Sequence, residues 1–221
     1  MLKKVLIILA VIIGLILVVG LLLPTTYHVE RSRVVAAPPE ALYAVVNDFK
    51  QWPKWDPWAG KDATMKYTYE GSPTGVGSVQ HFTSESGEGT IRIIESEPGR
   101  KVKMEMDFKM GEDKLPTATY TFEPIGDGKT KVTWSMDGEG SKPFGGYFGL
   151  MMDGMIGPDF ERGLENLDKA VTSAPAAAAP AAAPAAVEPA VEPAAVEPAA
   201  APAEDAPAEA APAEAAPAEA E

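Results

Sequence analysis

Few side chains of this sequence could perform acid–base chemistry. Histidine occurs twice, as His28 and His81, and an imidazole can take up or release a proton near pH 7. His81 could act as a general base if an acid or a hydroxyl lay beside it. A surface histidine, or one satisfied within a strand, needs neither, and we prefer that interpretation. Strand alternation puts His81 on one face with Val79 and Thr83, and whether that face points inward stays open.

The acidic residues offer no clearer catalytic group. A catalytic pair could be present among several acids of the central region, and no spacing singles one out: Asp48, Asp56, Glu95, Glu97 and Asp137. The sequence has no Gly-x-Ser-x-Gly elbow, P-loop, His-Glu-x-x-His helix or EF-hand loop. It has no cysteine, which excludes disulfides, thiolate zinc sites, iron–sulfur clusters and a cysteine nucleophile. We therefore predict neither a metal site nor a cofactor, and we do not favour an enzyme.

Charge and composition divide the chain into three parts. We predict a transmembrane anchor over residues 1–24, one folded domain over residues 25–171 and a tail over residues 172–221. All 17 aromatic residues lie in the central part, which has the length of one ordinary domain. The formal net charge is -13, and the tail contributes nine acidic residues and no basic one. A nucleic-acid partner is therefore not expected.

The first part predicts a membrane anchor. Residues 5–23 carry no charged or polar side chain, and a helix of that length matches the ~30 Å hydrocarbon core of a bilayer. No small-x-small cleavage site follows Leu23, so an uncleaved anchor is favoured over a cleaved signal peptide. Lys3 and Lys4 favour a cytoplasmic N-terminus. The chain would then be a single-pass membrane protein, with the domain and the tail on the extracytoplasmic (periplasmic) side.

The last part predicts a solvated, disordered tail. It contains 26 Ala, 10 Pro and nine acidic residues, and it has no Leu or aromatic side chain to bury. A proline every four or five residues opposes helix and favours extended, polyproline II geometry. The tail could contact a basic protein partner or could act only as a solubilising appendage, and composition favours the second.

Alternating apolar and polar residues predict an antiparallel sheet in the central part. Within residues 101–108, Val102, Met104, Met106 and Phe108 share one face, and charged residues occupy the other. Further strands are predicted at residues 28–35, 64–69, 78–84, 89–95, 118–122 and 131–136. Short breaks rich in glycine or proline separate them, and the Gly-Asp-Gly at residues 126–128 is the best turn signal. Such short connections indicate a meander.

Helical patterns bracket these strands. Pro38-Pro39-Glu40 starts a short helix, and an apolar stripe over residues 147–171 predicts a long one, which Gly157-Pro158 should kink or divide. A sheet with one wet face must cover its other face, and the long C-terminal helix is the only predicted element large enough to do so. The predicted fold class is α+β.

Five local strings carry a family resemblance. They are VVAAP at residues 34–38, NDFKQWPKWDPW at 47–58, GEGTIRIIESE at 87–97, TKVTWSMDG at 130–138 and MIGPDFERGLENL at 155–167. Together with the order of the elements, they resemble the SRPBCC, START-like (Bet v 1-like) superfamily, in its polyketide cyclase-like branch with an N-terminal membrane anchor. The resemblance covers about residues 26–170. It implies a helix-grip fold, in which a curved antiparallel sheet wraps around a long C-terminal helix.

A helix-grip fold implies a cavity between the sheet and that helix, which suits a hydrophobic ligand. We predict its lining from the inward strand faces and the facing helix: Met65, Tyr67, Phe82, Met104, Met106, Tyr120, Phe122, Trp134, Met136, Met151 and Met155. Methionine and aromatic side chains would fit an acyl chain or a polycyclic ligand, and plain core packing is an equally weighted alternative. Trp55 and Trp58 are predicted at the cavity entrance, where the alternative is a wedge between short helices and sheet.

Three functional hypotheses follow in order of preference. The first is a membrane-anchored domain that binds a hydrophobic small molecule or lipid. The second is an enzyme of polyketide cyclase type that acts on an apolar substrate, which requires an inward acid–base pair and therefore an inward His81. The third is a tethered protein-interaction module that uses the acidic tail.

Overall fold

The computed structural model describes residues 1–109 and 114–173 of the chain. In chain order the elements are α1 (Leu2–Leu22), β1 (Thr26–Val35), α2 (Pro39–Val46), the 3-10 helix η1 (Phe49–Lys54), β2 (Lys66–Gly71), β3 (Ser78–Ser84), β4 (Gly87–Glu97), β5 (Lys101–Asp107), β6 (Thr117–Gly126), β7 (Lys129–Glu139) and α3 (Gly145–Thr172). The predicted tail, with its protein partner, lies outside the described residues apart from Thr172 and Ser173.

Seven strands form one antiparallel sheet. Their order is β1-β7-β6-β5-β4-β3-β2, so β2 to β7 form a meander and β1 joins it beside β7. The hairpin between β6 and β7 turns on Asp127 and Gly128, whose φ angles are 51° and 67°. Positive φ at both central positions is what a tight two-residue hairpin favours. The predicted meander and its best turn signal are confirmed.

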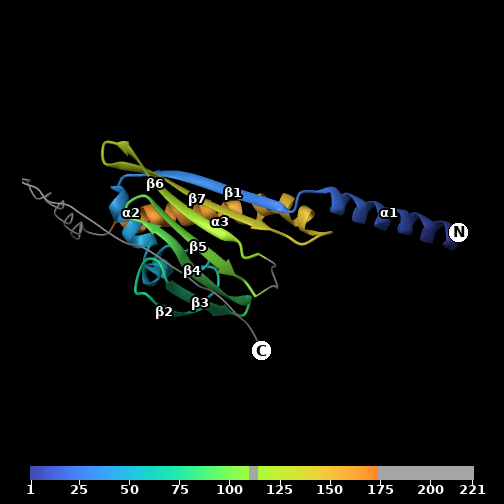
Figure 1. The fold of residues 1–221 in the computed structure, drawn as a ribbon, viewed down its shortest axis with the longest axis horizontal. Coiled ribbons are helices and arrows are strands. Elements are labelled where there is room, and N and C mark those ends of the chain that lie inside the picture. Colours follow the sequence, from blue (N-terminus) through green and yellow to red (C-terminus); the bar gives the residue numbers. More distant parts are fainter. Residues whose placement is uncertain (110–113, 174–221) are drawn as a thin grey trace, which may run out of the picture. The chain divides into compact units, whose positions relative to one another are not determined.

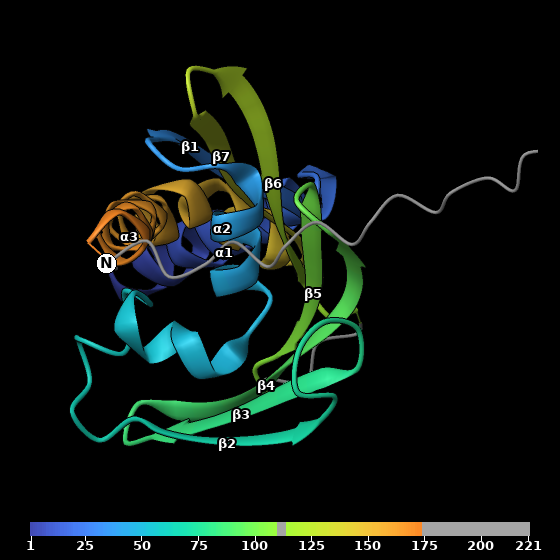
Figure 2. The same ribbon diagram turned by 90° about the vertical axis from the view of Figure 1, so that its left-hand side faces the viewer.

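Helices occupy the concave side of this sheet, which curls from β1 round to β2 (Figure 1, Figure 2). α3 packs against β1 and β7, α2 against β5 and β6, and η1 against β3. The α+β helix-grip architecture is thus confirmed. The sequence pattern indicates α3 as the covering element, and the structure adds α2 over β5 and β6 and η1 over β3. α3 is a single helix, which Pro158 does not divide.

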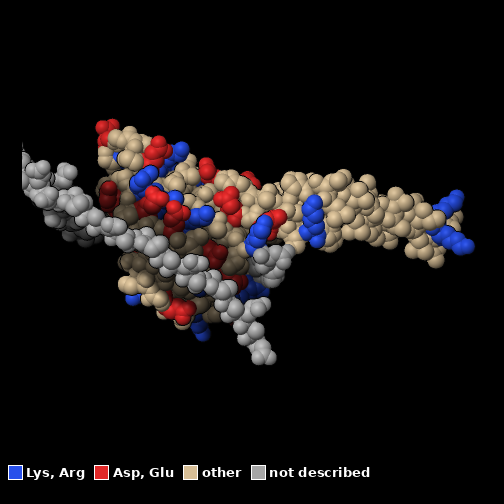
Figure 3. Space-filling view, in the orientation of Figure 1, with Lys and Arg blue, Asp and Glu red and all other residues tan. Residues whose placement is uncertain are grey.

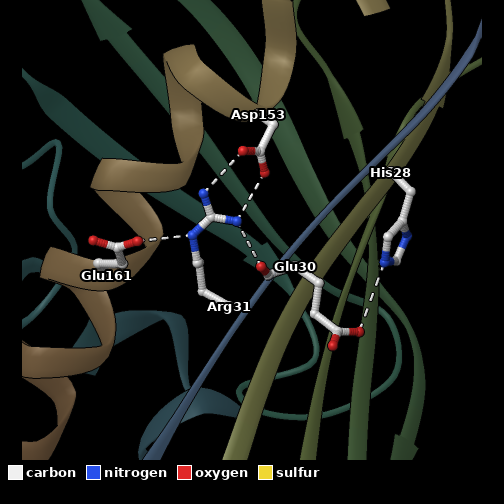
Figure 4. A network of polar contacts seen from close by, with 5 residues as sticks. All are labelled: His28, Glu30, Arg31, Asp153 and Glu161. Atoms are coloured by element: carbon white, nitrogen blue, oxygen red, sulfur yellow. Dashed lines mark hydrogen bonds and ion pairs between the residues drawn. The ribbon is translucent and has the colours of Figure 1, made fainter. Parts of the chain in front are cut away.

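Arg31 on β1 ties the edge of the sheet to α3 (Figure 4). Its Nε donates to Glu161 at 2.8 Å, and its two Nη atoms donate to the Asp153 carboxylate at 2.8 and 3.1 Å. These two acids lie on either side of Pro158, which has no N–H to donate within the helix. Gly157 permits the close approach, because a Cβ at that position would lie 2.2 Å from an Nη atom of Arg31. The Arg31 guanidinium therefore connects the part of α3 before Pro158 to the part after it.

Arg31→Lys is expected to shift the urea midpoint of unfolding downward by a small amount, because an ammonium cannot make the forked contact to two carboxylates. The shift should shrink in high salt, since Asp153 and Glu161 are largely exposed. Urea unfolding of the full chain in detergent micelles measures it. Arg33→Lys is the matched control, because Arg33 is paired with one carboxylate, Asp168, at 2.9 Å. Equal shifts in the two variants would contradict the expectation that the contact of Arg31 with two carboxylates stabilises the fold more than a single ion pair does.

α1 is long and apolar enough to cross a membrane. Gly20 is its one buried residue. Figure 3 shows the helix as a stretch without charged side chains that ends in basic residues at the N-terminus. The residues predicted as an anchor therefore form a helix that exposes its apolar side chains.

Candidate functional site

Most of the predicted cavity-lining side chains do point to the concave side of the sheet. Five strand residues are buried there: Met104, Tyr120, Phe122, Trp134 and Met136. Four others are half-buried: Met65, Tyr67, Phe82 and Met106. Apart from Met65 and Tyr67, these side chains belong to one hydrophobic core with residues of α2, η1 and α3.

Trp55 lies in the middle of the core and not at an entrance. Its side chain is 1% exposed, and its ring centroid lies 5.0 Å from that of Trp52, 6.0 Å from Tyr120 and 6.3 Å from Trp134. The prediction of Trp55 as an entrance residue was therefore wrong, because the Trp-rich segment folds inward over the sheet. Trp58 is half-buried and meets Trp134 edge-on at 5.8 Å.

Met151 and Met155 do not face the sheet. Their side chains are 61% and 53% exposed, whereas Met152 is 5% exposed and packs in the core. The prediction of these two methionines as cavity lining was wrong. The first half of α3 approaches β1 and the α1–β1 link through glycines such as Gly149 and Gly157, which turns the neighbouring methionines to the outside.

The space between sheet and α3 is filled by stacked rings. Trp134 lies face to face with Phe160 of α3 at 4.0 Å and an interplanar angle of 6°, and it stacks on Tyr120 at 4.8 Å. Two hollows with volumes of about 430 and 190 Å³ lie on the surface. One is lined by residues at the end of β7, such as Glu139, and the other by Phe49 and residues at the end of β2 and just after it. Between Trp134 and α3, stacked aromatic rings occupy the place where the interior cavity was predicted.

Asp56 is a buried acid at the margin of these rings. It is 9% exposed, its Oδ1 accepts from the Trp58 backbone N–H at 3.1 Å, and its Oδ2 accepts from the Tyr67 hydroxyl at 3.3 Å. Burial raises the pKa of the Asp56 carboxyl to about 6, against the two hydrogen bonds, and the negative charge of Asp159 adds to the rise. Among the five acids considered from the sequence, the structure thus singles out one that can exchange a proton near neutral pH.

Several polar atoms in the same interior have no partner. Within the described residues, no hydrogen-bond partner exists for the indole Nε1 of Trp55, the indole Nε1 of Trp134, the hydroxyl of Tyr120 or the Oε1 of Gln80. Three of the four belong to rings that contact one another. Asp56 also affects the Tyr120 hydroxyl. Burial is the larger cause, and the negative charge of Asp56 the smaller one, that holds the pKa of Tyr120 well above its usual value. The site is therefore apolar and contains a few unpartnered polar atoms.

Two contacts fasten residues 55–65 to α3. Lys61 is paired with the buried Asp159, and the side-chain amide of Asn166 donates to the carbonyl oxygen of Trp55 at 3.2 Å. The segment between η1 and β2 contains only turns. Its position over the aromatic rings therefore depends on these side-chain contacts and on the packing of its tryptophans.

The histidines lie outside this site. His81 is 38% exposed, with Nδ1 2.9 Å from the Thr90 hydroxyl and Nε2 3.0 Å from Glu70, whereas its neighbours Gln80 and Phe82 lie on the opposite face of β3. The weak candidate base thus points away from the aromatic core. His28 is exposed and pairs with Asp137 at 2.7 Å.

The remaining acids considered from the sequence have structural contacts. Asp48 caps η1 by accepting from the Lys50 backbone N–H, and Glu95 and Glu97 both pair with Lys101. No group of three or more potential metal ligands occurs within residues 1–109 and 114–173. The chemistry that the arrangement offers is therefore an acid of raised pKa among hydroxyl and indole donors.

Comparison with known proteins identifies the family. The family described as "Polyketide cyclase / dehydrase and lipid transport" matches residues 26–172. The chain belongs to this family. The resemblance to SRPBCC and Bet v 1-like proteins that the sequence strings carry is thereby confirmed.

A polyketide cyclase relative and two solved structures give the family assignment its context. The granaticin polyketide synthase bifunctional cyclase/dehydratase of Streptomyces violaceoruber is 27% identical over 120 residues, covering 49% of this chain. The match covers 33% of that enzyme, about a third of its length. Norcoclaurine synthase from Thalictrum flavum, solved with dopamine and hydroxybenzaldehyde, has a TM-score of 0.53 at 16% identity and covers 72% of this chain and 94% of its own. A protein from Chromobacterium violaceum has a TM-score of 0.50 at 18% identity, covering 65% and 96%. At these identities the structural likeness shows a shared fold alone.

Proposed function

We propose that this family member binds a hydrophobic small molecule or lipid between its sheet and α3. The observation that supports the proposal is the set of unpartnered donors on Trp55, Tyr120 and Trp134 inside an apolar interior. A buried polar group without a partner costs about 1–3 kcal/mol, and natural interiors contain few of them. A carbonyl, hydroxyl or carboxylate oxygen on an apolar ligand would satisfy these donors. The expected ligand is therefore an oxygenated ring system or acyl compound.

Binding requires that some aromatic side chains move, because they fill the interior. Trp58 is the best placed to do so, since it is half-buried and lies in the turn segment 55–65. An outward rotation of Trp58 would uncover the rings of Trp134 and Phe160, which it covers edge-on. Breaking the pair of Lys61 and Asp159 would release the same segment from α3. Trp58 thus stays our proposed entrance residue.

The proposal is tested by purifying the full chain from cells and analysing what co-purifies. Native mass spectrometry and an organic extract should yield one apolar compound at stoichiometric amount, beyond detergent and bulk phospholipid. Tyr120→Phe should reduce that compound several-fold, because the ligand loses a donor, and should leave the empty protein as stable as the wild type or slightly more stable. The second expectation follows because the removed hydroxyl has no partner.

Tyr43→Phe is the matched control for this substitution. The Tyr43 hydroxyl is partly buried, but unlike that of Tyr120 it is bonded to the Ser96 hydroxyl at 2.7 Å. Its loss should cost about 1 kcal/mol of stability and should leave the bound compound unchanged. An empty wild-type protein that also fails to take up fluorescent fatty-acid or polyaromatic probes would overturn the proposal.

A cyclase-type reaction is the second candidate, and Asp56 is the observation that favours it. A carboxyl with a pKa of about 6 can give or take a proton near neutral pH, and Tyr67 lies within 3.3 Å of it. In such a reaction Asp56 would act as the acid or base, and Tyr67 would hold its carboxyl in place. Turnover of an apolar substrate that is lost in Asp56→Asn, with binding retained, would distinguish catalysis from binding.

Membrane anchoring by residues 5–23 is the remaining part of the proposal. The supporting features are the length and apolar surface of α1. Lys3 and Lys4 at its start favour a cytoplasmic N-terminus, which puts the binding domain on the extracytoplasmic side.

A further inference from the structure

The loop before α3 packs along the last turns of α1. A Cβ at Gly20 would lie 2.2 Å from the carbonyl oxygen of Pro143 and 2.9 Å from the ring of Tyr147. The Tyr147 hydroxyl donates to the carbonyl of Ile16 at 2.8 Å, and Lys142 donates to the carbonyl of Leu21. The glycine thus permits close contact between the anchor helix and the start of α3.

These contacts fix the depth of α3 relative to α1. Ile16 precedes the end of α1 at Leu22 by six residues, which is about 9 Å along a helix. If α1 is in a bilayer up to Leu22, the Tyr147 hydroxyl lies about that far below the end of the span. The first turn of α3 then lies at the level of the outer boundary of the hydrocarbon.

The first two turns of α3 and the residue before them expose large apolar side chains. Phe144 is 61% exposed, Phe148 is 42% exposed and Met151 is 61% exposed. Their spacing of four and three residues places them on one stripe of the helix. Contact between large apolar side chains and water is unfavourable, and a contiguous exposed apolar stripe is typical of a surface that another apolar phase covers. An apolar phase beside α1 would remove it from water.

Polar side chains lie at the level where α1 ends. A surface hollow of about 430 Å³ is lined by a group that includes Thr25, Lys114, Glu139 and Lys142. Lys142 reaches the last turn of α1 through its contact with Leu21. Two cationic groups and one carboxylate at this height match the charged headgroup layer of a phospholipid, above the apolar stripe.

We propose that the start of α3, from Phe144 to Met151, is a second membrane contact beside α1. Phe144 and Phe148 insert at the boundary between acyl chains and headgroups of a phospholipid bilayer, and Lys142 lies among the headgroups. The inference rests on the proposed span of α1, but it goes beyond it, because a helix can span a bilayer without its domain touching the lipid. The contact fixes how the binding domain stands on the membrane.

The test places single cysteines in the full chain, which has none of its own. Phe148→Cys, Leu9→Cys and Val76→Cys are each labelled with a fluorophore and reconstituted in phospholipid vesicles that carry spin-labelled lipids. Position 148 should be quenched by spin labels near the headgroup, and position 9, in the middle of α1, by labels at the end of the acyl chain. Val76 is exposed at the opposite end of the sheet from α1 and should be quenched by neither.

Each other result has a distinct meaning. Quenching at position 9 without quenching at position 148 would overturn the second contact and leave the span intact. No quenching at position 9 would contradict the proposed membrane span of α1, and therefore also the second membrane contact that rests on it. If position 148 is shielded from aqueous iodide, is not quenched by lipid and cross-links to another chain, a second copy covers the stripe and the proposal is wrong.

Discussion

Trp134→Ala is expected to lower the free energy of unfolding by about 3–5 kcal/mol. The indole is 3% exposed, and it joins the sheet to α3 through its stack on Phe160. Its neighbours cannot easily collapse into the space, because Gly163 has no side chain to fill it and its backbone is already in contact with the indole. Chemical unfolding of the full chain in detergent micelles, followed by tryptophan fluorescence, measures the loss.

Phenylalanine substitutions separate packing from hydrogen bonding. Trp134→Phe should cost much less than Trp134→Ala, since the lost indole N–H has no partner. Trp52→Phe should cost about 1 kcal/mol more than Trp134→Phe, because the Trp52 indole donates to the Val46 carbonyl at 2.9 Å. A loss below about 1 kcal/mol in Trp134→Ala would contradict the filled interior.

Asp56→Asn is expected to make the protein more stable at pH 7 by up to about 3 kcal/mol, and by little at pH 4. The folded carboxyl has a pKa of about 6 instead of the usual 3.8, so the folded state holds a proton that the unfolded chain has released. Stability of the wild type therefore falls as the pH rises from about 4 to about 6 and stays lower above it. An amide has no such proton, and its oxygen can still accept from the Trp58 N–H.

The measurement is the difference in unfolding free energy between the variant and the wild type across pH 4 to 7, because other groups titrate in both. Asp62→Asn is the control. Hydrogen bonds from Thr64 hold the pKa of the Asp62 carboxyl below its usual value, so the wild type loses this contribution as the pH falls. Between pH 4 and 7 the difference curve for Asp56→Asn should therefore rise, whereas that for Asp62→Asn should be nearly flat and change only at lower pH. A flat curve for Asp56→Asn would mean that water reaches the carboxyl.

Strand alternation predicts the sheet well because each strand has one wet face. Val102 and Met104 are fully buried, and Lys101 and Lys103, which alternate with them, are not. The Gly-Asp-Gly turn is likewise a local property of the backbone, which needs no knowledge of distant partners. Both the strands and this turn could therefore be predicted from the sequence alone.

The first half of α3 could not be predicted in the same way. A hydrophobic pattern favours the face with Met151 and Met155, whereas the buried face there includes Gly145, Gly146 and Gly157. Glycine packs by permitting close approach, which no hydrophobicity scale detects. In the second half the buried face carries large apolar side chains, such as Phe160 and Leu164, and the prediction is confirmed.

Asp56 could not be selected from the sequence by the spacing of acids alone. Its burial depends on Trp55 and Trp58, which pack over the sheet and so place the intervening Asp56 in the interior. An acid placed between two tryptophans and before Pro57 was a signal of burial that could have been used. The unpartnered state of Tyr120 and Trp134 depends on long-range packing, for which the sequence holds no local signal.

The link between α1 and β1 consists of Leu23, Pro24 and Thr25. Three residues span at most about 10 Å. A domain anchored by α1 would therefore stay close to the membrane surface and could not reach far into the surrounding solution. Compounds dissolved in the bilayer would meet it by diffusion in two dimensions, at an effective concentration set by their partitioning into lipid. A water-soluble ligand would gain nothing from this arrangement. With α1 in a membrane, the short link would therefore favour the proposed binding of a ligand that is already dissolved in the bilayer.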